Sequence, residues 1–363
     1  MRVALVHDWL NQRGGAENVL EVLVEMFPQA PVYTSMYWAQ AMPPCYREWD
    51  IRTSWLDRLP LIKAHHQPFL PLYPLAFQGF DLSGYDLILS NKSGFCHGVR
   101  IPATATHICY CLTPTRYLWD FEGYIAQEGV GPLARWLVPP LLGPLRHWDL
   151  AAAERVTAFV AISREVQARI SAFYHRDSTI IHPPVDTGRF QPVEDRQDYF
   201  LIVSRLIPYK RIDLAVEACT KLGLPLVIIG EGRDRGRLEA LAGATVRFLG
   251  RVSDVERTRY MSRCRAFLFP GREDFGIAPL EAQAAGRPVI AYAAGGALDT
   301  VTEGVTGALF HEPAAESLME VLRTFDEDAY DPITIRQSAE RFDTAIFKRK
   351  LRAFISEILQ KGG

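Results

Sequence analysis

Strand-like apolar runs alternate with amphipathic helical stretches along this chain, and this alternation constrains the fold more than any other feature. The run at residues 2–7 ends in a glycine-rich loop, and apolar residues recur at helical spacing from Ala16 onward. The same order resumes at Tyr199 and continues to about Glu320. Short apolar strands that alternate with helices are typical of a parallel sheet covered by helices. The sequence therefore predicts an α/β protein built from doubly wound, Rossmann-like domains.

The length of the chain and its interruptions predict two such domains. The 363 residues exceed the roughly 250–300 residues at which a single hydrophobic core stops growing. Residues 183–184 are both proline and residues 191–198 are polar, as in a linker. A last helical stripe, which includes Phe347, must pack on another part of the chain. We predict an N-terminal domain at 1–185, a C-terminal domain at 186–342 and a helix at 343–363 that crosses back to the first domain.

Charge and composition narrow the class of protein. The net charge is −2, whereas a nucleic-acid-binding protein normally carries a net basic face. No uncharged apolar run reaches the ~18 residues of a membrane span, and Met1 leads directly into a strand-like run without a signal peptide. The cysteines are scattered without zinc spacing, so we expect reduced thiols and no metal. These features predict a cytoplasmic protein that binds no nucleic acid.

The stretch at residues 272–286, REDFGIAPLEAQAAG, is the strongest functional motif. An apolar run leads into it, a proline and a glycine break that run, and a helix is expected from about Gly276. The N-terminus of such a helix attracts phosphate, because it offers unpaired backbone N–H groups and a partial positive charge. Glu273 and Glu281 can accept hydrogen bonds from hydroxyl groups. A phosphate site flanked by hydroxyl acceptors indicates a sugar nucleotide.

Two turns add to this prediction. Arg205 and Lys210 flank the turn between the strand from Tyr199 and the next helix. Arginine can bind a diphosphate as a planar fork and lysine as a point charge, although such residues can also be solvated surface charges. In the N-terminal half, the glycines at 14–15 either let a backbone approach a ligand closely or form a plain structural turn.

Other N-terminal loops are candidates for an acceptor site. TPTRYLWD follows a buried strand and is dense in aromatic and charged residues, which suits a sugar. His97 also follows a strand, where a histidine is either structural or functional. Residues 55–80 and 129–148 mix tryptophan, leucine and proline with basic residues. Each is either a helical flap packed on the domain or a surface that touches anionic lipid or a lipid-linked substrate, and both can hold together.

Four motifs together resemble one family. HDWLNQRGGAE, YCLTPTRYLWD, SRLIPYKRID and EDFGIAPLE are similar to motifs of the retaining glycosyltransferases of family 4, and the similarity covers nearly the whole chain. The specific part is the E-x7-E pair together with the upstream arginine and lysine. The resemblance implies the GT-B fold of two facing doubly wound domains with a cleft between them. The N-terminal motifs look most like mannosyltransferase-type enzymes of bacterial polysaccharide assembly.

The resemblance also implies roles for individual residues. Arg205 and Lys210 would neutralise the donor diphosphate and Glu273 would bind hydroxyls of the donor sugar, so these three are the predicted catalytic residues. Glu281 would hold the ribose, and residues 252–254 would lie near the base. The predicted donor-binding residues are Gly15, Val252, Asp254, Phe275, Gly276, Ile277, Ala278 and Glu281. The predicted acceptor-binding residues are Asp8, His97, Arg116, Tyr117 and Asp120.

One position departs from the family pattern. The family commonly has Y-C-H-T-P, whereas this chain has Y-C-L-T-P with Leu112 in place of the histidine. That histidine is thought to touch the donor sugar near the reacting centre, and losing one charge-stabilising donor can cost on the order of 10²–10³ in rate. Either another group replaces it, with His7 and His97 as candidates, or the activity is weakened.

We predict transfer of a hexose, with retention of configuration, to a hydroxyl of a glycan or lipid-linked acceptor. The expected donor is GDP-mannose or another GDP- or UDP-hexose, with no metal or further cofactor. A sugar-nucleotide epimerase or hydrolase is an alternative, and so is a nucleotide-sugar-binding protein that lost its activity at Leu112. An NAD-dependent oxidoreductase is disfavoured, because neither half has the G-x-G-x-x-G fingerprint with its paired acidic residue. The protein would be cytoplasmic or peripheral on the inner face of the membrane.

Overall fold

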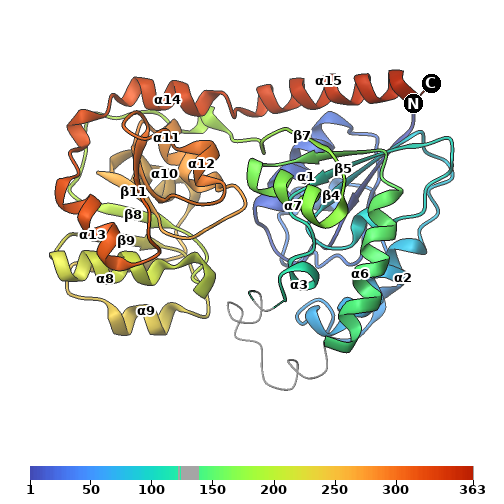
Figure 1. Ribbon diagram of the computed structural model, residues 1–363, viewed down its shortest axis with the longest axis horizontal. Helices are drawn as coiled ribbons and strands as arrows, with labels where there is room; N and C mark the ends of the chain where they lie inside the picture. Colours follow the sequence, from blue (N-terminus) through green and yellow to red (C-terminus); the bar gives the residue numbers. More distant parts are fainter. Residues whose placement is uncertain (122, 124–138, 363) are drawn as a thin grey trace. The chain divides into compact units, whose positions relative to one another are not determined.

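The computed structural model describes residues 1–121, 123 and 139–362. The chain divides into two compact units (Figure 1). The N-terminal unit comprises Met1–Pro184 together with Phe347–Gly363, and the C-terminal unit comprises Val185–Ile346. Each unit contains one parallel sheet.

The N-terminal unit is built on a seven-stranded sheet with the order β3-β2-β1-β4-β5-β6-β7. Its strands are β1 (Val3–His7), β2 (Val32–Thr34), β3 (Ile51–Thr53), β4 (Leu87–Lys92), β5 (Thr106–Cys111), β6 (Ala158–Ala161) and β7 (Ser178–Ile180). Its helices include α1 (Gly15–Met26), α2 (Tyr73–Gln78), α3 (Arg116–Trp119), α6 (Pro139–Glu154) and α7 (Arg164–Tyr174), with 3-10 turns η1 (Pro44–Glu48), η2 (Trp55–Arg58), η3 (Gln67–Leu72) and η4 (Cys96–Gly98). The strand order reverses between β1 and β4.

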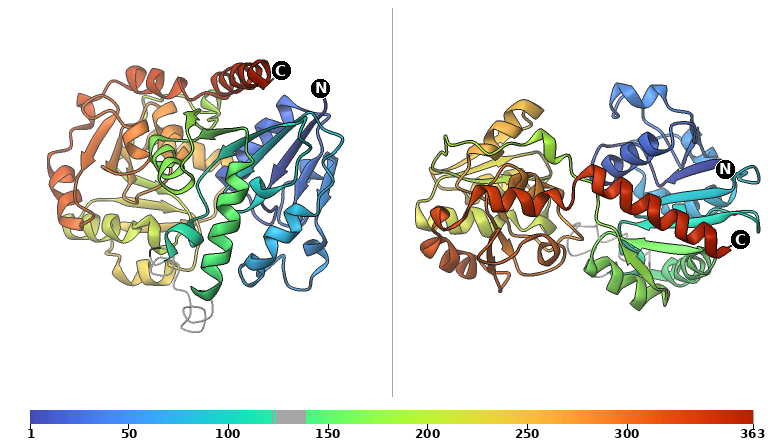
Figure 2. Two further views of the ribbon diagram at one scale, coloured as in Figure 1. Left: turned by 45° about the vertical axis from the view of Figure 1, so that its right-hand side comes forward. Right: turned by 90° about the horizontal axis from the view of Figure 1, so that it is seen from above.

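Helix α15 (Thr344–Gly362) belongs to the N-terminal unit from Phe347 onward, although it follows the C-terminal unit in sequence. Phe347 is buried and meets Tyr110 of β5 edge-on, with ring centroids 5.6 Å apart. Lys348 Nζ lies 2.6 Å from Glu25 Oε2 at the end of α1. Figure 2 shows α15, in red, running along this unit. The N-terminal unit is therefore assembled from both ends of the chain.

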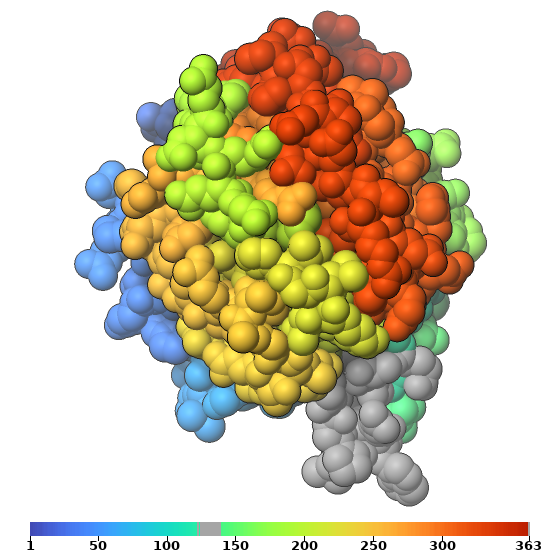
Figure 3. Space-filling view, turned by 90° about the vertical axis from the view of Figure 1, so that its left-hand side faces the viewer, coloured from blue at the N-terminus to red at the C-terminus, as the bar shows by residue number. Residues whose placement is uncertain are grey.

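The C-terminal unit is built on a six-stranded sheet with the order β10-β9-β8-β11-β12-β13. Its strands are β8 (Phe200–Val203), β9 (Leu226–Ile229), β10 (Val246–Gly250), β11 (Ala266–Phe269), β12 (Val289–Tyr292) and β13 (Gly307–Phe310). Its helices are α8 (Ile212–Leu222), α9 (Arg235–Leu241), α10 (Asp254–Arg263), α11 (Ile277–Ala284), α12 (Ala297–Thr300), α13 (Ala315–Thr324) and α14 (Pro332–Glu340), with 3-10 turns η5 (Thr187–Arg189), η6 (Pro208–Lys210) and η7 (Glu327–Ala329). Figure 3 shows one face of this unit, where α8 and α13 lie side by side.

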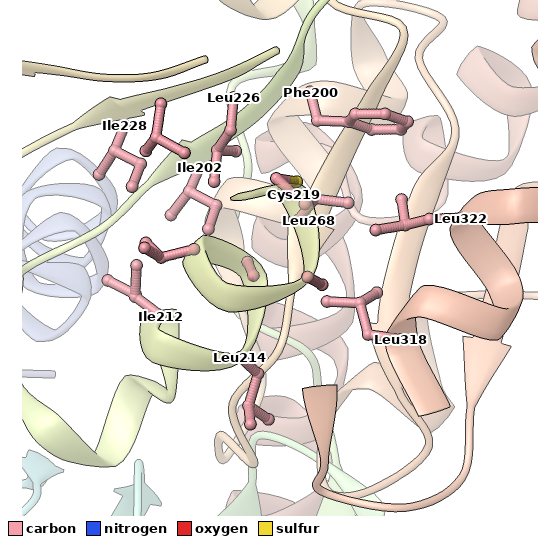
Figure 4. Close-up of a cluster of buried hydrophobic side chains, with 14 of the residues drawn as sticks. Phe200, Ile202, Ile212, Leu214, Cys219, Leu226, Ile228, Leu268, Leu318 and Leu322 are labelled. Carbon is pink, nitrogen blue, oxygen red and sulfur yellow. The ribbon is translucent and has the colours of Figure 1, made fainter. Parts of the chain in front are cut away.

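Apolar side chains fill both faces of this sheet. Phe200 and Ile202 of β8 pack with the apolar stripes of α8 and α13, in the cluster that Figure 4 shows. Leu201, between them in sequence, belongs to a second cluster with residues of α11 and α14. Side chains alternate in direction along a strand, so helices must cover both faces of a strand that is apolar throughout. Burying each such side chain contributes roughly 1.5–3 kcal/mol.

Candidate functional site

The strand order of the C-terminal sheet brings two predicted motifs together. β8 and β11 are neighbours, and the strand order reverses between them. Loops that leave the carboxyl ends of strands at such a switch point diverge and open a crevice for ligands. The loop after β8 carries Arg205 and Lys210, and the loop after β11 carries Glu273. The topology therefore places these distant segments at one edge of the sheet.

Lys210 and Glu273 meet directly at this edge. The Lys210 ammonium and the Glu273 carboxylate form an ion pair in which both side chains are mostly buried. The two loops can pack so closely because residue 271 is glycine, where a Cβ atom would lie 2.8 Å from the backbone oxygen of Lys210. This pair places a cation of the kind that can bind phosphate beside a carboxylate that can accept hydrogen bonds from hydroxyls.

Tyr209 contacts both predicted cations. Arg205, which is exposed, donates from Nη2 to the Tyr209 hydroxyl at 3.4 Å. Lys210 Nζ lies 5.2 Å from the centre of the Tyr209 ring, within the range of a cation–π contact. Sequence reasoning missed Tyr209, although its position between the two cations in SRLIPYKRID is the signal that could have identified it.

The N-terminus of α11 lies in the same loop. Gly276 precedes the helix with a φ of 99° and has no side chain with which to cap the first turn. This left-handed φ favours glycine, and a Cβ atom at Gly276 would also lie 2.6 Å from the Phe269 ring. Phe275 is buried and packs against Phe342. The predicted backbone contacts at Ile277 and Ala278 fall in the first turn of the helix, where N–H groups have no partner within the helix.

The second glycine turn holds the Glu273 backbone. Glu273 pairs with Gly295 in an isolated bridge, and the Gly296 N–H donates to the Glu273 carbonyl oxygen at 2.8 Å. Gly295 has a φ of 62°, and a Cβ atom there would lie 2.3 Å from that same oxygen. The loop that presents Glu273 is therefore fixed by a close approach that only glycine permits.

Gly295→Ala is expected to destabilise the C-terminal unit by about 1–3 kcal/mol, because alanine is strained at this φ and collides with the Glu273 backbone. Thermal unfolding measures the effect. The matched control is Gly236→Ala in α9, where no heavy atom lies within 4 Å of the new Cβ and alanine favours the helix by roughly 1 kcal/mol. Equal melting temperatures for the two variants would contradict this account.

Glu281 lies on α11 and pairs with an arginine that sequence reasoning missed. Its Oε2 is 2.5 Å from Nη1 of Arg257 on α10. Burial raises the pKa of Glu281, and Arg257 opposes this shift. Asp254 is exposed at the start of α10, with its Oδ1 3.1 Å from Nη2 of Arg189. Val252, two residues earlier, is half-buried.

In the N-terminal unit, Asp8 and His97 have structural roles. The Asp8 carboxylate is buried and accepts hydrogen bonds from the backbone N–H groups of the turn after β4, at 2.6–2.8 Å. His97 is also buried, with its Nε2 3.4 Å from the backbone oxygen of Asp149, and burial together with the Lys92 charge holds its pKa well below the usual value. Both side chains are buried and held by contacts within the unit, and their assignment to the acceptor site stays a prediction.

The other predicted acceptor residues lie on or beside α3. Arg116 and Tyr117 are half-buried in this helix, and Asp120 is exposed just after it. Leu112, at the end of β5, is half-buried and donates its N–H to the Lys92 carbonyl oxygen at 2.8 Å. Of the two histidines considered as replacements at this position, His97 is described above, and His7 is likewise buried. Neither side chain is accessible.

Gly15 begins α1, beside the carboxyl end of β1. The first turn of this helix is bonded to strands β1 and β4. Glu17 Oε1 lies 3.2 Å from His7 Nε2 of β1, and Asn91 Nδ2 of β4 donates to the Ala16 carbonyl oxygen at 2.7 Å. These buried contacts fix the turn at residues 14–15, where the backbone was predicted to approach a ligand.

A buried charged network supports the loop before α3, and sequence reasoning missed it. Lys92 is fully buried at the end of β4, and its Nζ donates to Thr115 Oγ1 at 3.1 Å. Asp149 of α6, also fully buried, accepts from Trp119 Nε1 and from the Tyr174 hydroxyl at 2.8 Å each. Burial lowers the pKa of Lys92, but Asp149 and other neighbours raise it, so that the net direction is upward. Both charges are thus held inside the unit.

Two segments of the N-terminal unit were predicted to face a membrane. Residues 55–80 form η2, η3 and α2, and the exposed fractions of Trp55, Leu61 and Leu75 are 44%, 73% and 60%. Of residues 129–148, positions 129–138 lie outside the described residues, and the remainder begins α6. Within the described ranges, no helix is both long and apolar enough to cross a membrane.

Comparisons with known proteins match part of the chain to one family model. Residues 186–348 match the model of a family described as glycosyl transferases group 1. The chain is similar to a glycogen synthase of Pseudomonas aeruginosa, with 35% identity over 304 residues that cover 78% of this chain and 56% of that protein. It is also similar to a GDP-mannose-dependent monoacylated alpha-(1-6)-phosphatidylinositol monomannoside mannosyltransferase of Corynebacterium glutamicum, with 31% identity over 199 residues, 46% of this chain and 52% of that protein. The chain spans about half the length of the curated relatives it matches.

A solved structure matches nearly the whole chain. Anabaena Alr3699/HepE in complex with UDP-glucose superposes with a TM-score of 0.73 at 18% identity, covering 98% of this chain and 100% of that one. This likeness shows the fold. The prediction of two Rossmann-like α/β sheets of the GT-B type is confirmed. Among the described residues, no group of His, Cys, Asp and Glu side chains is arranged to hold a metal ion.

Proposed function

We propose that this protein is a retaining glycosyltransferase of family 4 that transfers mannose from GDP-mannose to a hydroxyl of a glycan or lipid-linked acceptor, without a metal. The observation that carries the proposal is the meeting of Lys210 and Glu273 beside the N-terminus of α11. Both residues lie in the segment that matches the glycosyltransferase family model. A cation, a helix N-terminus and a hydroxyl acceptor at one place suit a diphosphate joined to a sugar.

In this proposal the C-terminal unit stabilises the leaving diphosphate. Arg205 and Lys210 supply positive charge where negative charge develops, and the first turn of α11 adds its unpaired N–H groups. Glu273 holds hydroxyls of the donor sugar and so orients its anomeric carbon toward the acceptor. We assign Glu273 to positioning rather than nucleophilic attack, because its hydroxyl contacts leave it poorly placed to reach the anomeric carbon.

The choice of GDP rests on the base end of the proposed site. The mannosyltransferase relative is GDP-mannose-dependent, whereas the Anabaena structure contains UDP-glucose, so the relatives differ in base. Asp254 has an exposed carboxylate close to Val252 in sequence. A carboxylate can accept from the neighbouring N1–H and N2–H groups of guanine, whereas uracil offers a single N–H donor. This acceptor favours GDP.

A thermal-shift screen with GDP, UDP and dTDP tests the proposal. A ligand at ~100 times its Kd adds roughly 2.7 kcal/mol of stability, and GDP is expected to give the largest shift. The absence of a shift with every nucleotide would overturn the proposal. Incubating GDP-mannose without acceptor separates a transferase, which releases little free sugar, from a hydrolase or an epimerase. Nucleotide binding without turnover on any acceptor would favour the binding protein predicted from Leu112.

We further propose that residues 55–80 bring the acceptor side of the protein to an anionic membrane surface. Trp55 of η2 and Leu75 of α2 expose apolar surface on elements that pack against one another, and Leu61 exposes more in the turn after η2. Arg58 is exposed among them, and Lys63 is half-buried beside Asp57. Apolar side chains interleaved with cations suit the boundary between lipid headgroups and acyl chains. Arg116, Tyr117 and Asp120 are the residues of the same unit that we propose for the acceptor sugar.

Leu61→Asp and Leu75→Asp are each expected to reduce co-sedimentation with vesicles that contain anionic phosphatidylglycerol, because each replaces inserted apolar surface with a negative charge. Wild-type binding should also fall as salt rises, since the cations contribute. The control is Ile333→Asp, since Ile333 is an exposed apolar residue of the C-terminal unit, with an exposed fraction of 56% against 60% for Leu75. Equal vesicle binding by all of these proteins would contradict the proposal.

A further inference from the structure

Glu281 is held by an arginine from a neighbouring helix. The Arg257 Nη1 of α10 lies 2.5 Å from the Glu281 Oε2 of α11, and the side chains are only 19% and 13% exposed. Charge-assisted contacts in a setting this protected are stronger and more directional than the same contacts in water. The carboxylate is therefore oriented by a specific partner rather than by solvent.

Arg257 is itself fixed by two further groups. Its Nε lies 3.6 Å from Asp254 Oδ1, one turn earlier on the same helix. Its guanidinium carbon lies 5.8 Å from the centre of the Phe190 ring, and the guanidinium of Arg189 lies at the same distance from that ring. Arginine has a planar fork that can serve a carboxylate while stacking on an aromatic ring, which lysine cannot do in the same way. The side chain is thus placed before any ligand arrives.

The contact with Arg257 affects how the Glu281 carboxylate can bind a ligand. Glu281 has two oxygens, and Arg257 contacts Oε2, so Oε1 can accept a hydrogen bond from a ligand hydroxyl. Burial raises the pKa of Glu281 while Arg257 counteracts the shift. Arg257 therefore affects both the direction of the carboxylate and its capacity to accept.

We propose that Arg257 is a positioning residue for nucleotide recognition: it orients Glu281 so that the carboxylate accepts from a ribose hydroxyl of the donor nucleotide. This inference rests on the proposed function, in which Glu281 holds the ribose. By orienting Glu281, Arg257 would allow the protein to distinguish ribose from deoxyribose. Arg257 itself would not contact the reacting atoms.

Isothermal titration calorimetry with GDP and with 2′,3′-dideoxy-GDP tests the inference. The wild type is expected to bind GDP at least ~10-fold more tightly than the dideoxy compound, as for a hydrogen bond to a charged group. Arg257→Gln is expected to bring this ratio toward one, and so is Glu281→Gln. Arg257→Lys keeps the charge but loses the fork, so an intermediate ratio is expected. The matched control is Arg259→Gln, an exposed arginine on the same helix, which should keep the wild-type ratio.

A loss of folding would weaken binding of both nucleotides together and leave their ratio unchanged, so the ratio reports positioning specifically. Wild-type ratios in both Arg257→Gln and Arg257→Lys would overturn the inference while leaving the proposed function in place. A wild type that binds GDP but does not distinguish the dideoxy compound would also overturn it. A wild type that binds neither GDP nor UDP would overturn the proposed function, and the inference with it.

Discussion

Replacing Lys92 by methionine is expected to lower the free energy of unfolding of the N-terminal unit by about 3–5 kcal/mol. The lysine is fully buried, and the Asp149 carboxylate in the same network is fully buried as well. Methionine preserves most of the volume but removes the ammonium, so the carboxylate would be left uncompensated in the interior. Urea unfolding followed by circular dichroism measures the change.

Two further variants separate charge from packing. The double variant Lys92→Met/Asp149→Asn removes both charges and is expected to recover part of the lost stability, because no uncompensated charge remains. Lys63→Met is the control, since Lys63 forms a partly exposed ion pair with Asp57 at 3.3 Å and such pairs contribute about 0–1 kcal/mol. An unfolding curve of Lys92→Met that overlays the wild type would show that the buried lysine is not compensating Asp149.

Replacing Lys210 by methionine is expected to lower the transfer rate by a factor on the order of 10²–10³. The mostly buried Lys210 lies against Glu273, where its charge is little screened by water. Loss of the cation removes stabilisation of the leaving diphosphate and leaves Glu273 without its partner. Nucleotide release from the donor, measured with an acceptor found by screening, reports the effect. Glu273→Ala is expected to lose activity as well, through loss of sugar positioning.

The same assay includes a conservative variant and a control. Lys210→Arg keeps the charge but changes its shape, so partial activity is expected. Lys221→Met removes an exposed lysine of α8 that pairs with Glu217 and should have near wild-type activity. Full transfer rates in Lys210→Met or Glu273→Ala would refute the roles assigned to that residue.

The sequence was most informative in the C-terminal unit, where local pattern and topology agree. The apolar runs there correspond to strands, and the run at 226–229 coincides with β9. Lys210 and Glu273 could be assigned to one site because each follows a strand, and the carboxyl ends of parallel strands share one edge of the sheet. Their direct contact could not be predicted, because it depends on the close packing of Gly271 against the Lys210 backbone.

Contacts between residues that are far apart in the chain could not be predicted from the sequence. Arg257 is one of several charged residues in RVSDVERTRY, and nothing in that local pattern distinguishes the one that reaches Glu281. Lys92 occupies a strand end, where a lysine normally extends into water. The strands β2 and β3 have three residues each, too few to show a period. In each case the decisive partner is remote in the chain.

For Asp8, the sequence could not distinguish a structural role from a functional one. A carboxylate directly after a strand, in a motif shared with a family of enzymes, is a reasonable candidate for ligand binding. In the structure its two oxygens satisfy a row of backbone N–H groups in the turn at 93–96. The functional and structural roles require the same residue type at the same sheet edge, so sequence position could not separate them.

The helix α15 makes the C-terminal unit an insertion within the N-terminal unit. Phe347, Leu351 and Ile355 are buried on the N-terminal unit, yet they are synthesised after all of residues 185–346. On the ribosome, the C-terminal unit can therefore complete its own sheet before the N-terminal unit receives its last helix. A fragment cut at residue 184 would lack these side chains and expose the apolar surface that they cover, so an expressible N-terminal fragment must include residues 347–363 joined by a linker.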